Sequence, residues 1–433
     1  MQVWDAGNDA SIQFDWKAEA VRYNAPLRTV AIMVENANLT RALLRRLEEL
    51  EAEECLLPNT SVASIGNGLD DPEGLNLSTW PVISLKSSGT TDSSSTRQIA
   101  ARLLIGADGI NSPVRTFAGI NTNGWDYNRH GVVATLKLEP SSTPDSTFSS
   151  SESPNLDSAL EDFLADDTNA PSTSHSPPQN ITPTNRATAY QRFLPSLGGP
   201  IAILPLPDNH ASLVWSTTPA NASMLKSLSP SAFVATINAA LRLDQVDIKY
   251  MLSLPSSSLP SDATDAHESE YHWRLSHVKK SGPARSPPNV IAVQPNTIAS
   301  FPLKLRNATT YTAPRIALAG DAAHTIHPLA GQGLNLGLGD AEALARNILG
   351  GVEHGADVGD ATGLEGYAGE RYGRAVEMGG GVDLLNGVYQ VGGTGSVIGD
   401  GLVGSVLSKA RGWGMWAVGS VPGVKEGIMR RAG

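Results

Sequence analysis

The sequence predicts an α/β fold, and three observations carry this prediction. Residues 315–335 pass from a short apolar strand through a glycine-containing turn into a helical pattern. Residues 103–115 repeat the first half of this arrangement, an apolar strand followed by a Gly-Ala-Asp-Gly turn. Between them, residues 188–206 and 212–217 alternate apolar and polar side chains, which is typical of antiparallel strands. We therefore expect a ligand-binding α/β part and a separate antiparallel sheet.

The segment 315–335 is the most informative part of the chain. Residues 316–319 predict a buried strand, and Gly320 lets the backbone turn where a side chain would block a ligand. Asp321 follows at the carboxyl end of the strand, where ligands bind in open α/β sheets. Its carboxylate can accept hydrogen bonds from ribose or ribityl hydroxyls.

The second half of this segment predicts the start of a helix. Gly331, Gly333 and Asn335 precede a helical pattern of apolar residues at positions 336, 338, 341, 344 and 345. The backbone N–H groups at such a start have no partner within the helix. They favour an electron-rich or anionic group.

Read together, the two segments resemble motifs of the flavin-dependent aromatic hydroxylases. Gly320-Asp321 resembles the GD motif of this family, and Asp108-Gly109 resembles its DG motif. Within the family the pattern is closest to the ubiquinone-biosynthesis hydroxylases, which are mitochondrial flavin monooxygenases. Further matching segments are residues 2–6, 34–36, 191–195, 203–206, 212–217, 301–303 and 383–385.

The resemblance implies FAD as cofactor and assigns candidate residues to it. Redox chemistry carried by the flavin needs no catalytic side chain, and we expect none. The cofactor-binding candidates are Asp108, Gly109, Gly320, Asp321, Pro328, Gly331, Gly333, Leu334, Asn335 and Asn36, the last with an equally plausible structural role at a helix start. The candidates on the substrate side are Arg192, Trp215 and His327, although an arginine on a strand more often serves a structural ion pair.

The resemblance also implies a reaction. A polyprenyl-substituted ring derived from 4-hydroxybenzoate would be hydroxylated at C5 with O2, using electrons from a ferredoxin and its reductase. The protein would lie on the matrix side of the mitochondrial inner membrane, as a peripheral member of a complex of ubiquinone-biosynthesis subunits. Two alternatives stay open: a flavin hydroxylase of a soluble phenol that uses NAD(P)H, and a non-catalytic remnant that binds partners.

The beginning of the chain departs from the family pattern. A flavin hydroxylase of this kind begins with a strand, a G-x-G-x-x-G turn and a helix. Residues 1–40 contain one glycine, Gly7, and the matching segments begin at residue 2. A gene start assigned at an internal methionine and a genuine truncation would both produce this pattern. We expect the chain alone to bind FAD poorly, with exposed edges at strands 103–105 and 316–319.

The chain divides into four expected parts. Residues 1–130 form the remainder of the FAD domain, with 1–28 and 58–100 partly contributing strands to the substrate side. Residues 131–303 form the substrate domain, whose Ser-, Thr- and Pro-rich stretch 140–186 predicts a disordered insertion. Residues 304–350 return to the FAD domain, and residues 351–433 form a C-terminal helical region.

Composition excludes several classes of protein. The net charge of −11 argues against nucleic-acid binding, which needs a basic surface. The one cysteine, Cys55, excludes an internal disulfide and is interpreted as a buried thiol. No apolar run reaches the roughly 18 residues that a membrane span needs. His324 and His327 would need further ligands to bind a metal, so we expect no metal site.

The remaining patterns predict helices and strands around this framework. Leucines at helical spacing in residues 29–57 predict an amphipathic helix that packs on the sheet, and residues 78–104 predict strands. Further helices are expected at 230–243, 336–350 and 363–388, the last interrupted by the glycines at 379–381. The polar stretch 256–269 resembles the insertion. The glycine-rich tail 391–431 predicts a helical pair or, alternatively, an interfacial surface for a membrane or partner subunits.

Overall fold

The computed structural model describes most of the chain, and the fold is drawn from that part. The described residues are 1–8, 10–15, 30–70, 74, 76–87, 97–140, 188–254, 266–278, 287–328 and 331–390. The expected insertion at 140–186 and the tail at 391–431 therefore lie almost entirely outside the described residues, as does most of the polar stretch 256–269. Its last residues begin the helix α8 (Ala266–His277).

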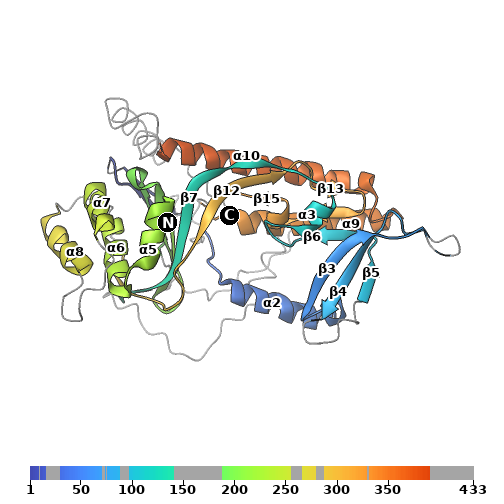
Figure 1. The fold of residues 1–433 in the computed structure, drawn as a ribbon, viewed down its shortest axis with the longest axis horizontal. Coiled ribbons are helices and arrows are strands. Elements are labelled where there is room, and N and C mark those ends of the chain that lie inside the picture. The colour runs from blue at the N-terminus through green and yellow to red at the C-terminus, as the bar shows by residue number, and fades with distance from the viewer. Residues whose placement is uncertain are drawn as a thin grey trace, which may run out of the picture.

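A nine-stranded sheet forms one half of the molecule (Figure 1). Its strands run in the order β15-β12-β7-β10-β9-β8-β1-β2, and β11 also pairs with β7. All the pairs are antiparallel except β1 with β8, so the predicted antiparallel strands at 188–206 and 212–217 are confirmed. The strands are β1 (Gln2–Asp5), β2 (Ser11–Gln13), β7 (Thr122–Leu138), β8 (Tyr190–Leu194), β9 (Gly199–Pro205), β10 (His210–Thr217), β11 (Val290–Val293), β12 (Ala299–Ala308) and β15 (His324–Thr325).

Helices cover this sheet at the end that lies far from the GD turn (Figure 1). The predicted helix at 230–243 is confirmed as α6 (Pro230–Arg242), which begins where the Ser229 side chain accepts a hydrogen bond from the Ala232 N–H. Its apolar face, with Phe233 and Ile237, packs with Trp215 of β10 in the largest core. The neighbouring helices are α5 (Pro219–Ser227), α7 (Gln245–Ser253) and α8, and a 3-10 turn at Pro195–Leu197 joins β8 to β9.

A smaller sheet carries the two motif turns. It consists of β13 (Thr312–Ala313), β14 (Ile316–Leu318) and β6 (Leu104–Gly106) in the order β13-β14-β6. Exposed edges were expected on both motif strands; this is correct for β6, which ends the sheet, and wrong for β14, which is paired on both sides. The helices α3 (Pro113–Phe117), α9 (Gly333–Glu353) and α10 (Ala361–Gln390) pack against it around a second core that includes Ile316, Leu344 and Tyr367.

Two long strands join the halves of the molecule. β7 and β12 run side by side from the large sheet towards the small one (Figure 1), with Ala299 opposite Val133 at one end and Ala308 opposite Thr122 at the other. The expected domain boundaries at 130 and 303 thus fall inside continuous strands. Residues 1–28 and 58–100 were expected to contribute strands to the substrate side. β1 and β2 do join the large sheet, but residues 58–100 form a separate sheet. The division into four parts stays a prediction.

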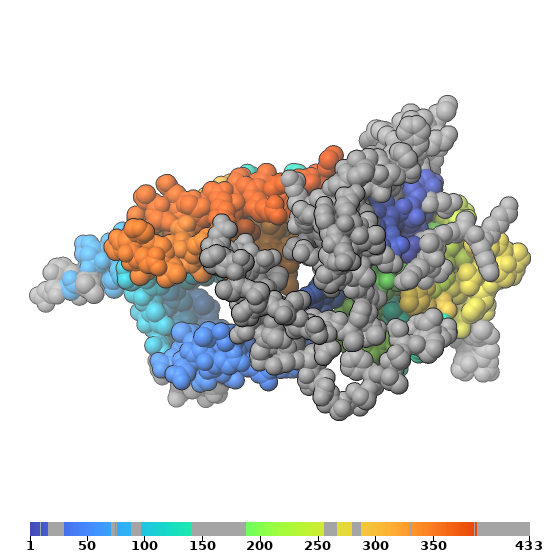
Figure 2. Space-filling model, turned by 180° about the vertical axis from the view of Figure 1, so that it is seen from behind, coloured from blue at the N-terminus to red at the C-terminus, as the bar shows by residue number. Residues whose placement is uncertain are grey.

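Among the described residues, that separate sheet touches the second core only at its edge, through Ile65, and its helix has no buried residue. It contains β3 (Thr60–Asn67), β4 (Pro81–Ser87) and β5 (Arg97–Ala100), and it follows α2 (Asn36–Glu49) and a 3-10 turn (Glu53–Cys55). In Figure 2 the blue residues of α2 and β3 lie below the orange residues of α9 and α10. The helix was predicted correctly, but its packing was not, because α2 has no buried residue and Leu43 is 54% exposed. The interpretation of Cys55 as a buried thiol is also wrong, since Cys55 is exposed.

The C-terminal helix α10 differs from its prediction in one respect. It continues through Gly379, Gly380 and Gly381, where an interruption was expected. Gly379 lies on a packed face of the helix, because an added Cβ would touch Leu305 of β12 and Ile326 at ordinary distances. In the part of the chain that the structure describes, no helix is long and apolar enough to cross a membrane.

Candidate functional site

The two motif turns lie next to each other because their strands pair. β14 and β6 are parallel, with Ala317 opposite Ile105, so both turns leave from the same edge of the sheet. Gly320 has φ +60° and Gly109 has φ +84°, backbone conformations that favour glycine. The two turns are far apart in the chain, since one contains Gly109 and the other Asp321. The pairing of their strands brings them together at the edge where α/β sheets bind ligands.

The two motif carboxylates have different surroundings. Asp321 is exposed, and its carboxylate has no hydrogen-bond partner among the residues that the structure describes. Asp108 is also exposed, but its Oδ2 accepts a hydrogen bond of 3.1 Å from the Val114 N–H at the start of α3. Asp321 is therefore free to bind the hydroxyls of a ligand, whereas one oxygen of Asp108 already holds a helix.

Arg115 connects the two turns directly. Its Nη1 donates to the Ala322 carbonyl at 2.7 Å, and its Nη2 donates to the Ile110 carbonyl at 2.7 Å. One guanidinium thus joins the residue after Asp321 to the turn that follows Asp108. The sequence pattern did not single out Arg115.

The start of α9 offers backbone donors near the GD turn. Gly331 has φ +64°, and Gln332, the residue before the helix, makes no side-chain hydrogen bond that caps it. The first turn holds no acidic residue, and Leu334 and Asn335 are exposed. Side chains added at Gly331 or Gly333 would meet nothing within 4 Å, so the surface beside these two glycines is open within the described structure. An uncapped helix start facing open space fits the electron-rich edge of a flavin.

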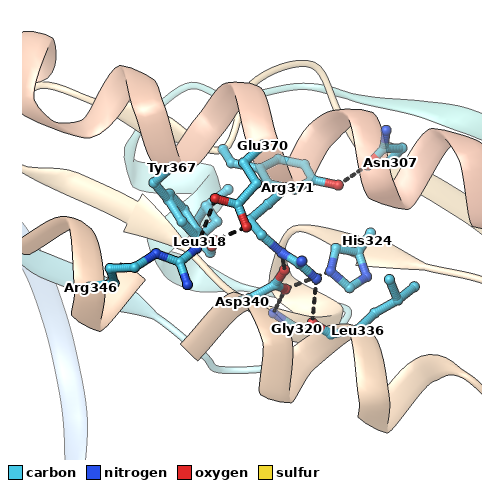
Figure 3. Close-up of polar contacts among 11 residues, drawn as sticks. Asn307, Leu318, Gly320, His324, Leu336, Asp340, Arg346, Tyr367, Glu370 and Arg371 are labelled. Carbon is cyan, nitrogen blue, oxygen red and sulfur yellow. Dashed lines mark hydrogen bonds and ion pairs between the residues drawn. The ribbon is translucent and has the colours of Figure 1, made fainter. Parts of the chain in front are cut away.

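A buried cluster of charged and polar groups lies behind these two elements (Figure 3). Asp340 of α9 is fully buried, and its carboxylate accepts three hydrogen bonds. They come from His324 Nε2 at 2.6 Å, Arg371 Nε at 2.8 Å and the Gly320 N–H at 2.9 Å. Arg371 Nη2 also donates to the Leu336 carbonyl at 3.1 Å. We call Gly320, His324, Asp340 and Arg371 the Asp340 cluster.

The electrostatics of the cluster favour an ionised Asp340. Burial by itself would raise the pKa of this carboxyl, but the hydrogen bonds from His324, Arg371 and the Gly320 N–H together hold the pKa below its ordinary value. A negative charge on Asp340 is therefore balanced by the guanidinium of Arg371.

Sequence reasoning did not identify this cluster, although the sequence contains a signal for it. The buried face of α9 consists of Leu336, Asp340, Ala343 and Leu344. The predicted apolar pattern also includes Leu338 and Ala341, which are exposed. A single aspartate four residues from a buried leucine on each side marks a carboxylate on the packed face, where it needs partners.

His327 lies in the segment that connects β15 to α9. It is buried, and its ring packs edge-on against Tyr127 of β7 with 4.9 Å between centroids. Burial lowers the pKa of His327 to about 4, so its imidazole is neutral near pH 7. Burial, followed by the charge of Asp383 on α10, raises the pKa of Tyr127 far above its usual range. Pro328 follows His327 and is half-buried.

The other substrate-side candidates lie elsewhere. Trp215 is fully buried in the core between the large sheet and its helices. Arg192 of β8 donates from Nη1 to the Ala240 carbonyl of α6 at 3.0 Å, a contact within the core of the substrate part. A substrate role for these two residues stays a prediction.

Asn36 is not brought to the motif turns by any hydrogen bond in the described part of the chain. It is the first residue of α2 and is exposed, and the neighbouring hydrogen bond at this helix start joins Asn38 Nδ2 to Glu35 Oε2 at 2.8 Å. Its role at the cofactor therefore also stays a prediction.

Comparison with known proteins identifies the family. Residues 259–378 match the family described as "FAD binding domain". The protein named "Ubiquinone biosynthesis monooxygenase COQ6, mitochondrial" of Xenopus tropicalis is 34% identical over 397 residues, which cover 90% of this chain and 68% of the frog protein. The human protein of the same name is 32% identical over 429 residues, covering 99% of this chain and 74% of its own.

The fold is shared with solved monooxygenases. The structure of p-nitrophenol 4-monooxygenase PnpA from Pseudomonas putida has a TM-score of 0.54 and 15% identity, covering 99% of this chain and 80% of that one. PqsL from Pseudomonas aeruginosa, described as a probable FAD-dependent monooxygenase, has a TM-score of 0.51 and 18% identity, covering 90% and 78%. These likenesses concern the fold alone, and they confirm the predicted FAD-dependent hydroxylase fold.

The share of each relative that is covered varies. The Saccharomyces cerevisiae protein of the same name is 34% identical over 350 residues, which cover 78% of this chain but 61% of the yeast protein, and the Schizosaccharomyces pombe protein is covered to 47%. The frog and human proteins are covered to more than two thirds at identities above 30%. The predicted FAD cofactor and family are confirmed by these matches. The chain belongs to the family of ubiquinone biosynthesis monooxygenases.

Proposed function

We propose that this chain is the FAD-dependent monooxygenase that hydroxylates the polyprenylated aromatic ring at C5 during ubiquinone biosynthesis. The observation that carries the proposal is the meeting of the two motif turns with the uncapped start of α9 at one sheet edge. The substrate and reaction come from the relatives, which are named as ubiquinone biosynthesis monooxygenases.

The described residues fit the binding of FAD in two places, and a further residue holds the two motif turns together. Asp321 offers a carboxylate to the ribityl hydroxyls, and the amides at Gly333, Leu334 and Asn335 offer donors to the electron-rich edge of the ring. Arg115 holds the DG turn against the GD turn, so the two ligand-binding turns keep one spacing. When bound, FAD supplies the redox chemistry that transfers one oxygen atom of O2 to the ring.

The loop of His327 and Pro328 has a different proposed part, on the substrate side. The imidazole of His327 is neutral and buried, and it packs edge-on against Tyr127, next to which lies the carboxylate of Asp383. A neutral ring in this loop would help to orient a phenolic substrate without adding a charge of its own. His327 is the substrate-side candidate with geometric support, because it lies in the same loop as the flavin-binding residues.

The finer parts of the proposal concern partners and place. A ferredoxin and its reductase would donate the electrons, and other subunits of the ubiquinone-biosynthesis complex would bind the protein. It would lie against the matrix face of the mitochondrial inner membrane, which is consistent with relatives that are named mitochondrial.

The test measures FAD binding and hydroxylation with the same purified chain, with FAD in large excess because this chain alone is expected to bind FAD poorly. FAD binding is followed by quenching of flavin fluorescence. Hydroxylation is followed by mass spectrometry with a polyprenylated 4-hydroxybenzoate derivative and with the same ring without its tail, each with ferredoxin and reductase or with NADPH. We expect product from the tailed ring with the ferredoxin system, carrying the new oxygen at C5.

Other outcomes identify the alternatives. Equal turnover of the tail-free ring with NADPH would favour a hydroxylase of soluble phenols. Absence of both FAD binding and complementation of a ubiquinone-deficient strain would favour the protein that only binds partners.

A further inference from the structure

The Asp340 cluster connects four separate elements through one carboxylate. Asp340 belongs to α9, Gly320 to the GD turn, His324 to β15 and Arg371 to α10. Figure 3 shows the three donors converging on the Asp340 side chain, with the Arg371 guanidinium between Asp340 and Leu336. The side chains of His324, Asp340 and Arg371 are buried, so they can act through the GD turn without touching the cofactor themselves.

The contacts determine how the GD turn lies on α9. The Gly320 N–H donates to Asp340 in the second turn of the helix, and Arg371 donates to the Leu336 carbonyl in the first. The backbones of Gly320 and Gly337 also meet closely, because a Cβ added at Gly337 would lie 3.4 Å from the Gly320 Cα. The position of Asp321 relative to the free amides of α9 thus depends on these hydrogen bonds.

Stability alone does not explain a buried ion pair at this position. Two charges removed from water lose hydration that their attraction barely restores, and apolar side chains of similar volume are often equally stabilising. Only an acceptor at Asp340 can bind the Gly320 N–H and the donors of His324 and Arg371 at the same time. The balanced pair also adds no net charge beside the α9 N-terminus, where the helix dipole favours an electron-rich ligand.

We propose that Asp340 is a positioning residue, which through Gly320 and Arg371 holds the GD turn at the distance from the start of α9 that FAD binding requires. This inference rests on the proposed function for its ligand. Its geometric part concerns the protein alone and can be measured without FAD.

The first variant is Asp340→Asn, which keeps the shape and removes the charge and one acceptor. We expect amide hydrogen exchange in residues 317–324 to become about tenfold faster, the size expected for the loss of one charge-assisted hydrogen bond. Exchange in β8 to β10 should not change. The FAD dissociation constant should rise about tenfold or more. Glu370→Gln is the matched control, because Glu370 precedes Arg371 on α10 and makes an exposed ion pair with Arg346.

A double variant, Asp340→Leu with Arg371→Met, separates positioning from stability. It removes both buried charges, so most of the stability lost in Asp340→Asn should return in urea unfolding. The fast exchange at 317–324 and the weak FAD binding should persist. If the slow exchange at 317–324 and the tight FAD binding both returned along with stability, the proposal would be overturned.

A third variant covers failure of these proteins to fold. His324→Leu removes the donor to Asp340 and leaves the ion pair with Arg371 in place, and we expect a smaller increase in exchange over the same residues. Exchange at 317–324 equal to wild type in every folded variant would overturn the proposal. If no variant, including wild type, binds FAD while the exchange differences remain, positioning is supported and the proposed function fails.

Discussion

Asp321 and Asp108 follow paired strands, but their carboxylates have different hydrogen-bond partners. Asp108 already accepts the Val114 N–H, whereas Asp321 has no partner in the described structure. A carboxylate without an internal partner contributes little to folding, so its removal should affect ligand binding more than stability.

We therefore predict that Asp321→Asn weakens FAD binding by about tenfold, since a charge-assisted hydrogen bond is worth about 1.5–3 kcal/mol. The unfolding free energy should change by less than about 0.5 kcal/mol. The measurements are flavin fluorescence titration and urea unfolding. Asp208→Asn is the control, because Asp208 lies in an exposed turn with φ +57°, which asparagine tolerates well. Equal FAD affinity in wild type and Asp321→Asn would contradict the assignment.

The lowered pKa of His327 should make the stability of the folded protein depend on pH. Burial lowers the pKa of the folded state to about 4, below the value of about 6.5 for an unfolded chain. As the pH falls, the unfolded chain binds the proton first, so the contribution is complete above about pH 6.5 and is lost progressively towards pH 4. The full loss is about 3 kcal/mol.

The measurement is urea unfolding of wild type and His327→Gln at intervals from pH 7.5 to 4.5. The wild type should lose stability more steeply than the variant below about pH 6.5. His354→Gln is the control at an exposed histidine. Parallel curves for wild type and His327→Gln would show that His327 takes up its proton equally in both states.

At the scale of elements, local patterns predicted which segments form helices and strands, but not which faces are covered. The helix α6 was predicted, and its apolar stripe is buried against the large sheet. The stripe of α2 has the same form, yet no residue of α2 is buried. A stripe predicts that a face can be buried and says nothing about the presence of a partner element.

The glycines of α9 and α10 give a prediction at this scale. Gly373 is exposed in the middle of α10, and a Cβ there would meet nothing within 4 Å. Gly373→Ala should therefore raise the unfolding free energy by about 0.5–1 kcal/mol, because glycine is the poorer helix former. At Gly339 of α9 a Cβ would lie 2.8 Å from Arg371 Nη2.

Gly339→Ala should consequently lower stability, since the guanidinium that it displaces is held by Asp340 and the Leu336 carbonyl. Urea unfolding of both variants provides the comparison. An increase of similar size in both would mean that Arg371 moves away at no cost, and that the Asp340 cluster is looser than its hydrogen bonds indicate.

At the scale of the whole molecule, long strands join the two larger hydrophobic cores of the described residues. The first core lies between the large sheet and α5 to α7, and the second surrounds β14, α9 and α10. β7 and β12 contribute to both regions (Figure 1). A ligand that binds only at the second core stabilises that region directly.

We predict that unfolding has two transitions and that FAD shifts one of them more than the other. At an FAD concentration about 100 times its dissociation constant, the second core should gain about 2.7 kcal/mol. Hydrogen exchange measured across a urea series should show this gain in residues 316–344 and a smaller one in 190–217. A single transition, shifted equally in both segments, would mean that β7 and β12 couple the cores into one cooperative unit.

The sequence by itself determined the parts of this protein that depend on neighbouring residues. Glycine conformations at the turns, apolar strands ending in Gly-Asp, the alternating strands and the start of α9 all follow from windows of a few residues. Tertiary structure alone decided the pairing of β6 with β14, the meeting of Arg115 with Ala322, and the burial of Asp340 between His324 and Arg371. These contacts join residues that are far apart in the chain or lie on different elements, and they form only where packing brings a donor to an acceptor. The exposed face of α2 has the same origin, because burial needs a second surface as well as an apolar one.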